Sequence, residues 1–168
     1  MALTALPRNG IESTMIEPPS IDHLYPDSDK TLSVLLAIVP AGSGDSTDNH
    51  WMLEWTVSEG NNSVVRRLQI VREQGFDHLT NWGPVTVTAD ELTNPSQKFS
   101  VGDLTLSQRK DLEKIAMDTP VMVPNGEWNC QNWTTNVLKE AVGKKLLDIR
   151  IVDRVLISAG EIQPLSSW

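Results

Sequence analysis

Cysteine is almost missing from this sequence, in which Cys130 is the only one among 168 residues. A single cysteine cannot form an intramolecular disulfide. The opening "MALTALPRNG" lacks the basic start and long apolar stretch of a secretory signal, and no apolar run elsewhere is long enough to cross a bilayer. We therefore expect a soluble, cytoplasmic protein without a stable membrane anchor.

Positive charge and histidine are also scarce. Lys and Arg number 14 against 22 Asp and Glu, a net charge of −8. Proteins that bind nucleic acid neutralise phosphates with clustered Lys and Arg, so we expect no nucleic-acid partner. The three histidines and the cysteine show no metal-ligand spacing. We expect neither a metal nor another cofactor, and the sequence indicates nothing about oligomeric state.

Two segments differ in composition. Residues 1–29 hold four prolines and several acids without a sustained period, which predicts an irregular Pro-rich arm, partly disordered or laid over the surface. Residues 30–168 are predicted to form a single domain. Four apolar or alternating runs in it indicate strands, at residues 31–40, 50–57, 63–71 and 84–89.

Helices are predicted after these strands. Helical spacing indicates one helix over residues 104–117, with Ser107 as a cap, and another from Cys130 to about Gly143. The segment 146–159 fits either a strand or a helix. Strands that do not alternate regularly with helices indicate an α+β fold, with an antiparallel sheet packed against helices.

Cys130 lies at the start of its predicted helix, in the segment "NGEWNCQNW". Asn129 is a favoured N-cap residue, which makes Cys130 the first helical residue. Unpaired backbone N–H groups and the helix dipole stabilise an anion there, so this position lowers the pKa of a thiol. Trp133 and Val137 share its face of the helix, and a small buried core cysteine is the alternative interpretation.

His50 is the best placed histidine to act as a base for this thiol. It opens the second predicted strand after a polar loop, and a strand-end histidine can reach a helix N-terminus to form a Cys–His pair. His23 lies in the proline-rich arm, and His78 lies in a loop or short strand.

The order of these motifs resembles the circularly permuted branch of the papain-like NlpC/P60 superfamily, which includes the lecithin:retinol acyltransferase-like thiol enzymes. There a strand opens with His-Trp, and a later helix opens with a motif close to Asn-Cys-Glu-His-Phe. Here these positions read His50-Trp51 and Asn129-Cys130-Gln131-Asn132-Trp133. The chain is also similar to small fungal proteins with an "HW" strand and an "NCQ.W" helix. The resemblance covers residues 31–142 and implies a permuted papain-like fold with Cys130 as nucleophile and His50 as base.

The position that would orient the base departs from the pattern of these relatives. In the lipid-acting relatives a second histidine on the neighbouring strand orients the base, in a stretch like Val-Val-His-Leu. The stretch here is "VVRRL", and arginine cannot accept a hydrogen bond from an imidazole N–H. The orienting group could be Gln69, His78, a backbone carbonyl or none.

Tryptophan is abundant, with six residues against two Phe and one Tyr. Its large apolar wall and polar N–H suit a ligand cleft. Trp51, Trp82 and Trp128 are therefore candidates to contact a substrate, although core packing is the alternative for each. The amide of Gln131, together with the backbone N–H of Cys130, is a candidate to bind an oxyanion.

Two classes of function follow from these residues. The first is a cysteine-nucleophile hydrolase or acyltransferase, acting on an amide or ester of a small molecule or peptide. The second is a pseudoenzyme or small-molecule-binding protein with the same cleft, or a cyclase or isomerase that uses acid/base chemistry without a covalent intermediate.

Overall fold

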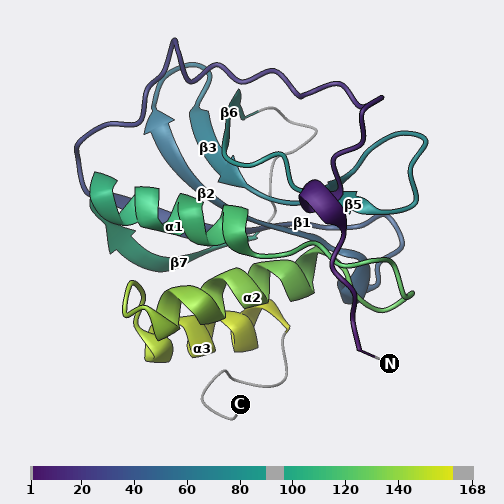
Figure 1. The fold of residues 1–168 in the computed structure, drawn as a ribbon. Helices are drawn as coiled ribbons and strands as arrows, with labels where there is room; N and C mark the ends of the chain where they lie inside the picture. The colour runs from purple at the N-terminus through teal and green to yellow at the C-terminus, as the bar shows by residue number, and fades with distance from the viewer. Residues whose placement is uncertain (1, 90–96, 161–168) are drawn as a thin grey trace.

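The structure, a computed structural model, describes residues 2–89 and 97–160. Its centre is a five-stranded antiparallel sheet with the strand order β6-β3-β2-β1-β7 (Figure 1). The strands are β1 (Leu32–Val39), β2 (His50–Ser58), β3 (Val64–Leu68), β6 (Val85–Thr88) and β7 (Gln97–Leu104). A separate pair joins β4 (Val71–Arg72) to β5 (Leu79–Thr80).

One strand of the sheet, β7, was not predicted from the sequence. It pairs with β1 from Leu32↔Leu104 to Ile38↔Gln97. Its segment "QKFSVGDL" is mostly polar because β7 is an edge strand, of which only Val101 and Leu104 are fully buried. The other predicted strands are found close to their expected ranges.

Three helices follow the sheet: α1 (Leu106–Asp118), α2 (Cys130–Gly143) and α3 (Ile149–Ala159). The cap of α1 is Thr105 rather than Ser107, because the Thr105 hydroxyl accepts from the Gln108 N–H at 3.3 Å and the Gln108 side chain accepts from the Thr105 N–H at 2.9 Å. The segment that fitted either strand or helix is the helix α3, capped by Asp148. The predicted α+β class is confirmed.

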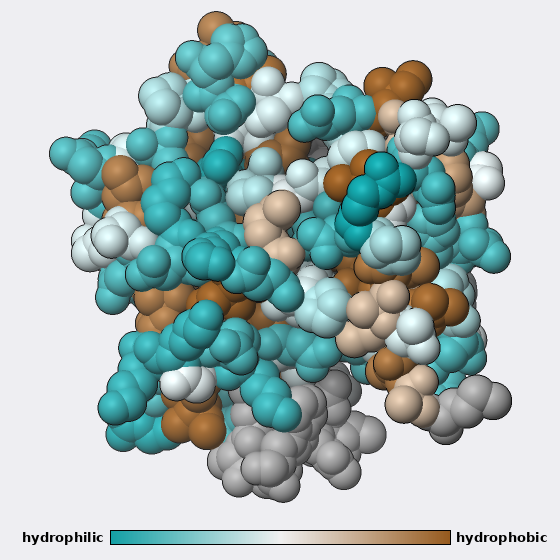
Figure 2. Space-filling view, viewed as in Figure 1, coloured by the Kyte–Doolittle hydropathy of each residue, from teal (hydrophilic) through white to brown (hydrophobic). Residues whose placement is uncertain are grey.

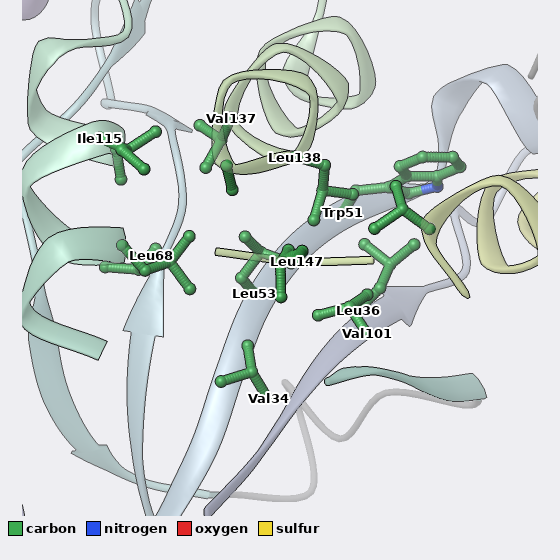
Figure 3. Packing of buried hydrophobic residues seen from close by; sticks show 14 of the residues in the cluster. Val34, Leu36, Trp51, Leu53, Leu68, Val101, Ile115, Val137, Leu138 and Leu147 are labelled. Carbon is green, nitrogen blue, oxygen red and sulfur yellow. The ribbon is translucent and has the colours of Figure 1, made fainter. Parts of the chain in front are cut away.

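The three helices lie on one face of the sheet (Figure 1). Trp51, Leu53 and Trp55 of β2 project to this face and are at most 2 % exposed. Figure 3 shows Trp51 and Leu53 among the apolar side chains that fill the space beneath Val137 and Leu138 of α2. We call this buried cluster the helix-side core. Figure 2 shows that hydrophilic side chains cover much of the outer surface on this side. No helix in the described ranges is long and apolar enough to cross a membrane.

The opposite face of the sheet carries buried charge. Side chains alternate along a strand, so Met52 and Glu54 of β2 point away from the helices. The Glu54 carboxylate, 1 % exposed, accepts from Arg67 Nε at 2.9 Å and pairs with Lys98 Nζ at 3.1 Å. Arg66, the neighbour of Arg67, points instead to the helix side.

The N-terminal segment 2–31 runs over the surface and is mostly irregular, apart from a short 3₁₀ turn at Pro7–Gly10 (Figure 1). Its Ile21 N–H donates to the Thr86 carbonyl at 2.9 Å, which covers the free edge of β6. Its Asp27 carboxylate accepts from Trp55 Nε1 at 3.0 Å and from Arg109 of α1 at 2.9 Å. These contacts attach the arm to the sheet edge and to the helix-side core.

Candidate functional site

Cys130 is the first residue of α2, as the sequence predicts. The Asn129 side chain accepts from the Gln131 N–H at 2.9 Å, and the Asn132 side chain accepts from the Asn129 N–H at 2.9 Å. This reciprocal capping box satisfies two backbone N–H groups that a helix start leaves without partners. The local sequence Asn-Cys-Gln-Asn therefore sets the position of the cysteine at the helix N-terminus.

The start of α2 is also joined to the loop before β2. The side-chain amide of Asn129 donates to the Thr47 carbonyl at 3.1 Å. Gln131 Nε2 donates to the carbonyls of Ser46 and Asn49, at 2.8 and 3.0 Å. Both amide hydrogens of Gln131 are therefore engaged. Gln131 holds the 46–49 loop to the helix, which replaces the predicted role of this amide in binding substrate.

The Cys130 thiol lies against the main chain next to His50. Its Sγ donates to the Asn49 carbonyl at 3.7 Å. Burial raises the pKa of the Cys130 thiol, and the N–H groups of Trp51, Cys130 and Gln131 offset only part of this increase. The sequence-based expectation of a lowered pKa is wrong, because desolvation outweighs the helix N-terminus. The free protein therefore holds a neutral thiol.

The His50 imidazole is oriented by Gln69. His50 Nε2 lies 2.9 Å from Gln69 Oε1, and since an amide oxygen only accepts, Nε2 carries the proton and Nδ1 keeps a lone pair. Burial lowers the pKa of His50, the Gln69 hydrogen bond opposes this, and the charge of Arg67 adds to the decrease. Of the orienting groups considered from the sequence, Gln69 is the one that contacts His50.

His50 and Cys130 approach the same strand end from different sides. Trp51 points into the helix-side core, so His50 projects to the opposite face with Met52, whereas Cys130 packs against the helix-side core. Within residues 2–89 and 97–160, no hydrogen bond joins the two side chains. The predicted approach of His50 and Cys130 across one cleft is therefore not found, and what lies between the two side chains is the main chain at the start of β2.

The side chain of His50 lines a cavity of about 390 Å³, which we call the His50 cavity. Its walls are mostly apolar and also contain Gln69 and two arginines; they comprise Val39, His50, Met52, Arg67, Gln69, Ile70, Val71, Arg72 and Leu79. Cys130 is not part of this lining. A smaller cavity of about 120 Å³ shares Gln69 and Val71 with it and is lined further by Trp82.

The remaining predicted site residues lie elsewhere. His78 is buried, and its Nε2 donates to the Gly10 carbonyl at 2.9 Å, so it attaches the arm and does not contact His50. Gly10 has a φ of +80°, and a Cβ there would lie 2.4 Å from the Leu79 carbonyl oxygen, so no other residue fits this contact. Trp51 belongs to the helix-side core. Trp128 packs on the edge of that core, and only Trp82 lines a cavity.

Sequence reasoning did not identify the two arginines of the His50 cavity. Arg67 could have been predicted from the alternation of side chains along a strand. Arg67 and Gln69 are two residues apart, so their side chains share a face of the sheet. Arg72 belongs to β4, and it reaches the cavity together with Leu79, its partner in the pairing of β4 with β5. No sequence pattern predicts that approach.

Comparison of the chain with protein-family models found no match, and the comparisons with curated proteins and with solved structures found none either. Among the described residues, no group of three or more His, Cys, Asp or Glu is arranged to hold a metal ion. The chemistry of the site is therefore argued from its geometry.

Proposed function

We propose that this protein is a thiol-dependent acyl-transfer enzyme, a hydrolase or acyltransferase acting on an amide or ester, with a permuted papain-like arrangement. One observation carries the proposal: the Cys130 thiol lies against the main chain that flanks His50, while Gln69 holds Nε2–H of the imidazole. Nδ1 is left as the acceptor. The set comprises a nucleophile, a base and a positioning residue.

The reaction begins from a neutral pair. Because burial raises the pKa of Cys130 and lowers that of His50, the thiol proton passes to Nδ1 only as sulfur attacks the acyl carbon. The C–S bond forms, and the imidazolium returns the proton to the leaving group as the C–N or C–O bond breaks. Water or a second nucleophile then attacks the thioester carbon while His50 takes its proton, and the imidazolium returns this proton to the sulfur as the C–S bond breaks.

The oxyanion of each tetrahedral intermediate would lie near the start of α2. As the first residue of the helix, Cys130 has a backbone N–H without an intrahelical acceptor. Because the two side chains approach the end of β2 from different faces, proton transfer requires the first residues of β2 to turn so that Nδ1 reaches the sulfur when the substrate binds.

A second function is favoured by one specific observation, which is that the His50 cavity does not include Cys130. In this alternative the protein binds a small molecule in that cavity, or acts on it by proton transfer at His50, and the cysteine only packs the helix start. The two functions differ in whether sulfur ever bonds to the ligand.

The test is acylation of the thiol by p-nitrophenyl acetate, followed by mass spectrometry of the peptide that contains Cys130. We expect an acetyl adduct on Cys130, its loss in Cys130→Ser, and a decrease in rate of about 10²-fold or more in His50→Ala. His23→Ala, which changes an exposed histidine of the arm, is the matched control and should react at the wild-type rate.

A thermal melt of each variant must accompany the rates, since a hydroxyl without a partner at this half-buried position costs about 1–3 kcal/mol. Acylation of Cys130 at equal rates with and without His50 would refute the pair. A folded Cys130→Ser protein that releases nitrophenol at the wild-type rate, with the rate lost in His50→Ala, would establish the second function instead.

A further inference from the structure

The His50 cavity combines an apolar wall with positive charge, although the chain as a whole is acidic. Five of its lining residues are Val39, Met52, Ile70, Val71 and Leu79. The net charge of the chain is −8, yet the lining contains two arginines, Arg67 and Arg72. No carboxylate is part of this lining.

The two arginines differ in how far they are already satisfied. Arg67 is 5 % exposed at its side chain and donates to Glu54 at 2.9 Å. Its charge still acts inside the cavity, since it contributes to the lowered pKa of His50. Arg72 lies at the exposed rim, and within the described ranges its side chain makes no hydrogen bond or ion pair.

We infer that the His50 cavity binds a small amphipathic carboxylate, with its apolar body against the aliphatic wall and its anionic group paired with Arg72. A guanidinium matches a carboxylate with two parallel hydrogen bonds. The volume of about 390 Å³ falls within the range of small-molecule sites. Binding of this ligand does not require the proposed function. The inference rests on that function only if the ligand is also the substrate or product of the acyl transfer.

The neighbouring 120 Å³ cavity does not suit the anionic group. Glu17 of the arm is part of its lining, and the indole N–H of Trp82 is already donated to Glu73 at 2.7 Å. A carboxylate there would face a like charge without a free donor from Trp82. The anion is therefore expected at Arg72, and the apolar body extends between the rim and His50.

The test compares binding of octanoate and of octanamide, which have the same apolar chain but differ in charge, by isothermal titration calorimetry. The protein is the full chain with Cys130→Ser, so that no acyl chemistry contributes. We expect octanoate to bind about fivefold more tightly than octanamide, a modest preference because Arg72 is exposed to solvent. Added salt should weaken octanoate binding and leave octanamide binding unchanged.

Arg72→Gln should abolish this preference with no change for octanamide, and Arg72→Lys should keep part of it. Arg154→Gln, at an exposed position of α3 outside both cavities, is the matched control and should keep it all. Equal binding of the two probes, binding of neither, or a preference that persists in Arg72→Gln would overturn the inference. Each of these results leaves the acylation of Cys130 unaffected, so the two proposals fail separately.

Discussion

The two faces of β2 present alternate residues of one strand to different surroundings. Trp51, Leu53 and Trp55 pack beneath the helices. Of the three, Trp55 contacts charged groups: its indole N–H donates to Asp27, and the Arg109 guanidinium lies over its ring. On the other face, His50 and Glu54 contact Gln69 and Arg67. The helix-side core is filled with apolar side chains, whereas the other face of the sheet contains the His50 cavity and the smaller cavity beside it. Stability is therefore concentrated on one face and ionisable chemistry on the other.

This contrast places the candidate site at the strand end, where the faces meet. Cys130 belongs to the helix-side architecture through α2, and His50 belongs to the charged face. The rigid core fixes the sulfur, while the polar face orients the imidazole. The proposed pair would depend on the junction between the faces, where Gln131 holds the 46–49 loop to α2.

The largest expected effect tests the helix-side face. Leu53→Ala removes a side chain that is 0 % exposed and leaves a cavity beneath α2, so the free energy of unfolding should fall by about 3 kcal/mol. Urea denaturation followed by tryptophan fluorescence measures this loss. Leu24→Ala, the same change at a residue that is 64 % exposed in the arm, should alter stability by less than about 0.5 kcal/mol. Similar losses of unfolding free energy for both variants would contradict the view that the helix-side core carries most of the stability.

A smaller loss is expected from the charged face. Glu54→Gln keeps the size of the side chain but leaves the buried Arg67 guanidinium facing a neutral amide. The free energy of unfolding should fall by about 2 kcal/mol, because the charge pair is lost while Arg67 retains a further contact. Glu59→Gln, at an exposed turn position, is the control. If Glu54→Gln were as stable as wild type, the ion pair would contribute nothing to this face.

The smallest effect concerns the pH dependence of stability at His50. Its pKa in the folded protein lies below the ordinary 6.5, so below pH 6.5 the unfolded chain binds the proton more readily than the folded one. The free energy of unfolding should therefore fall as the pH drops from 6.5 toward the lowered value. Denaturation at steps between pH 7.5 and 5 should show a shallower fall for His50→Gln than for wild type. Parallel curves would mean that burial does not disfavour the charged imidazole.

Some helices and strands could be predicted from the sequence because they depend on neighbouring residues. The position of Cys130 at a helix start follows from Asn129, whose short side chain caps the backbone N–H groups next to it. Four of the strands followed from apolar runs. The sequence missed β7 because an edge strand has no continuous apolar pattern, and it misplaced the cap of α1 because Thr105 and Ser107 are equally good capping residues.

By itself, the amino-acid sequence determined the α+β class, the helix that Cys130 begins and the strand that His50 begins, since periodicity and capping act between near neighbours. Only the tertiary structure decided that Gln69 orients His50, that Gln131 binds loop carbonyls, and that burial raises the pKa of Cys130. Each of these depends on distances between segments remote in the chain. Desolvation in particular is a property of the whole packed surroundings, and no local motif encodes it.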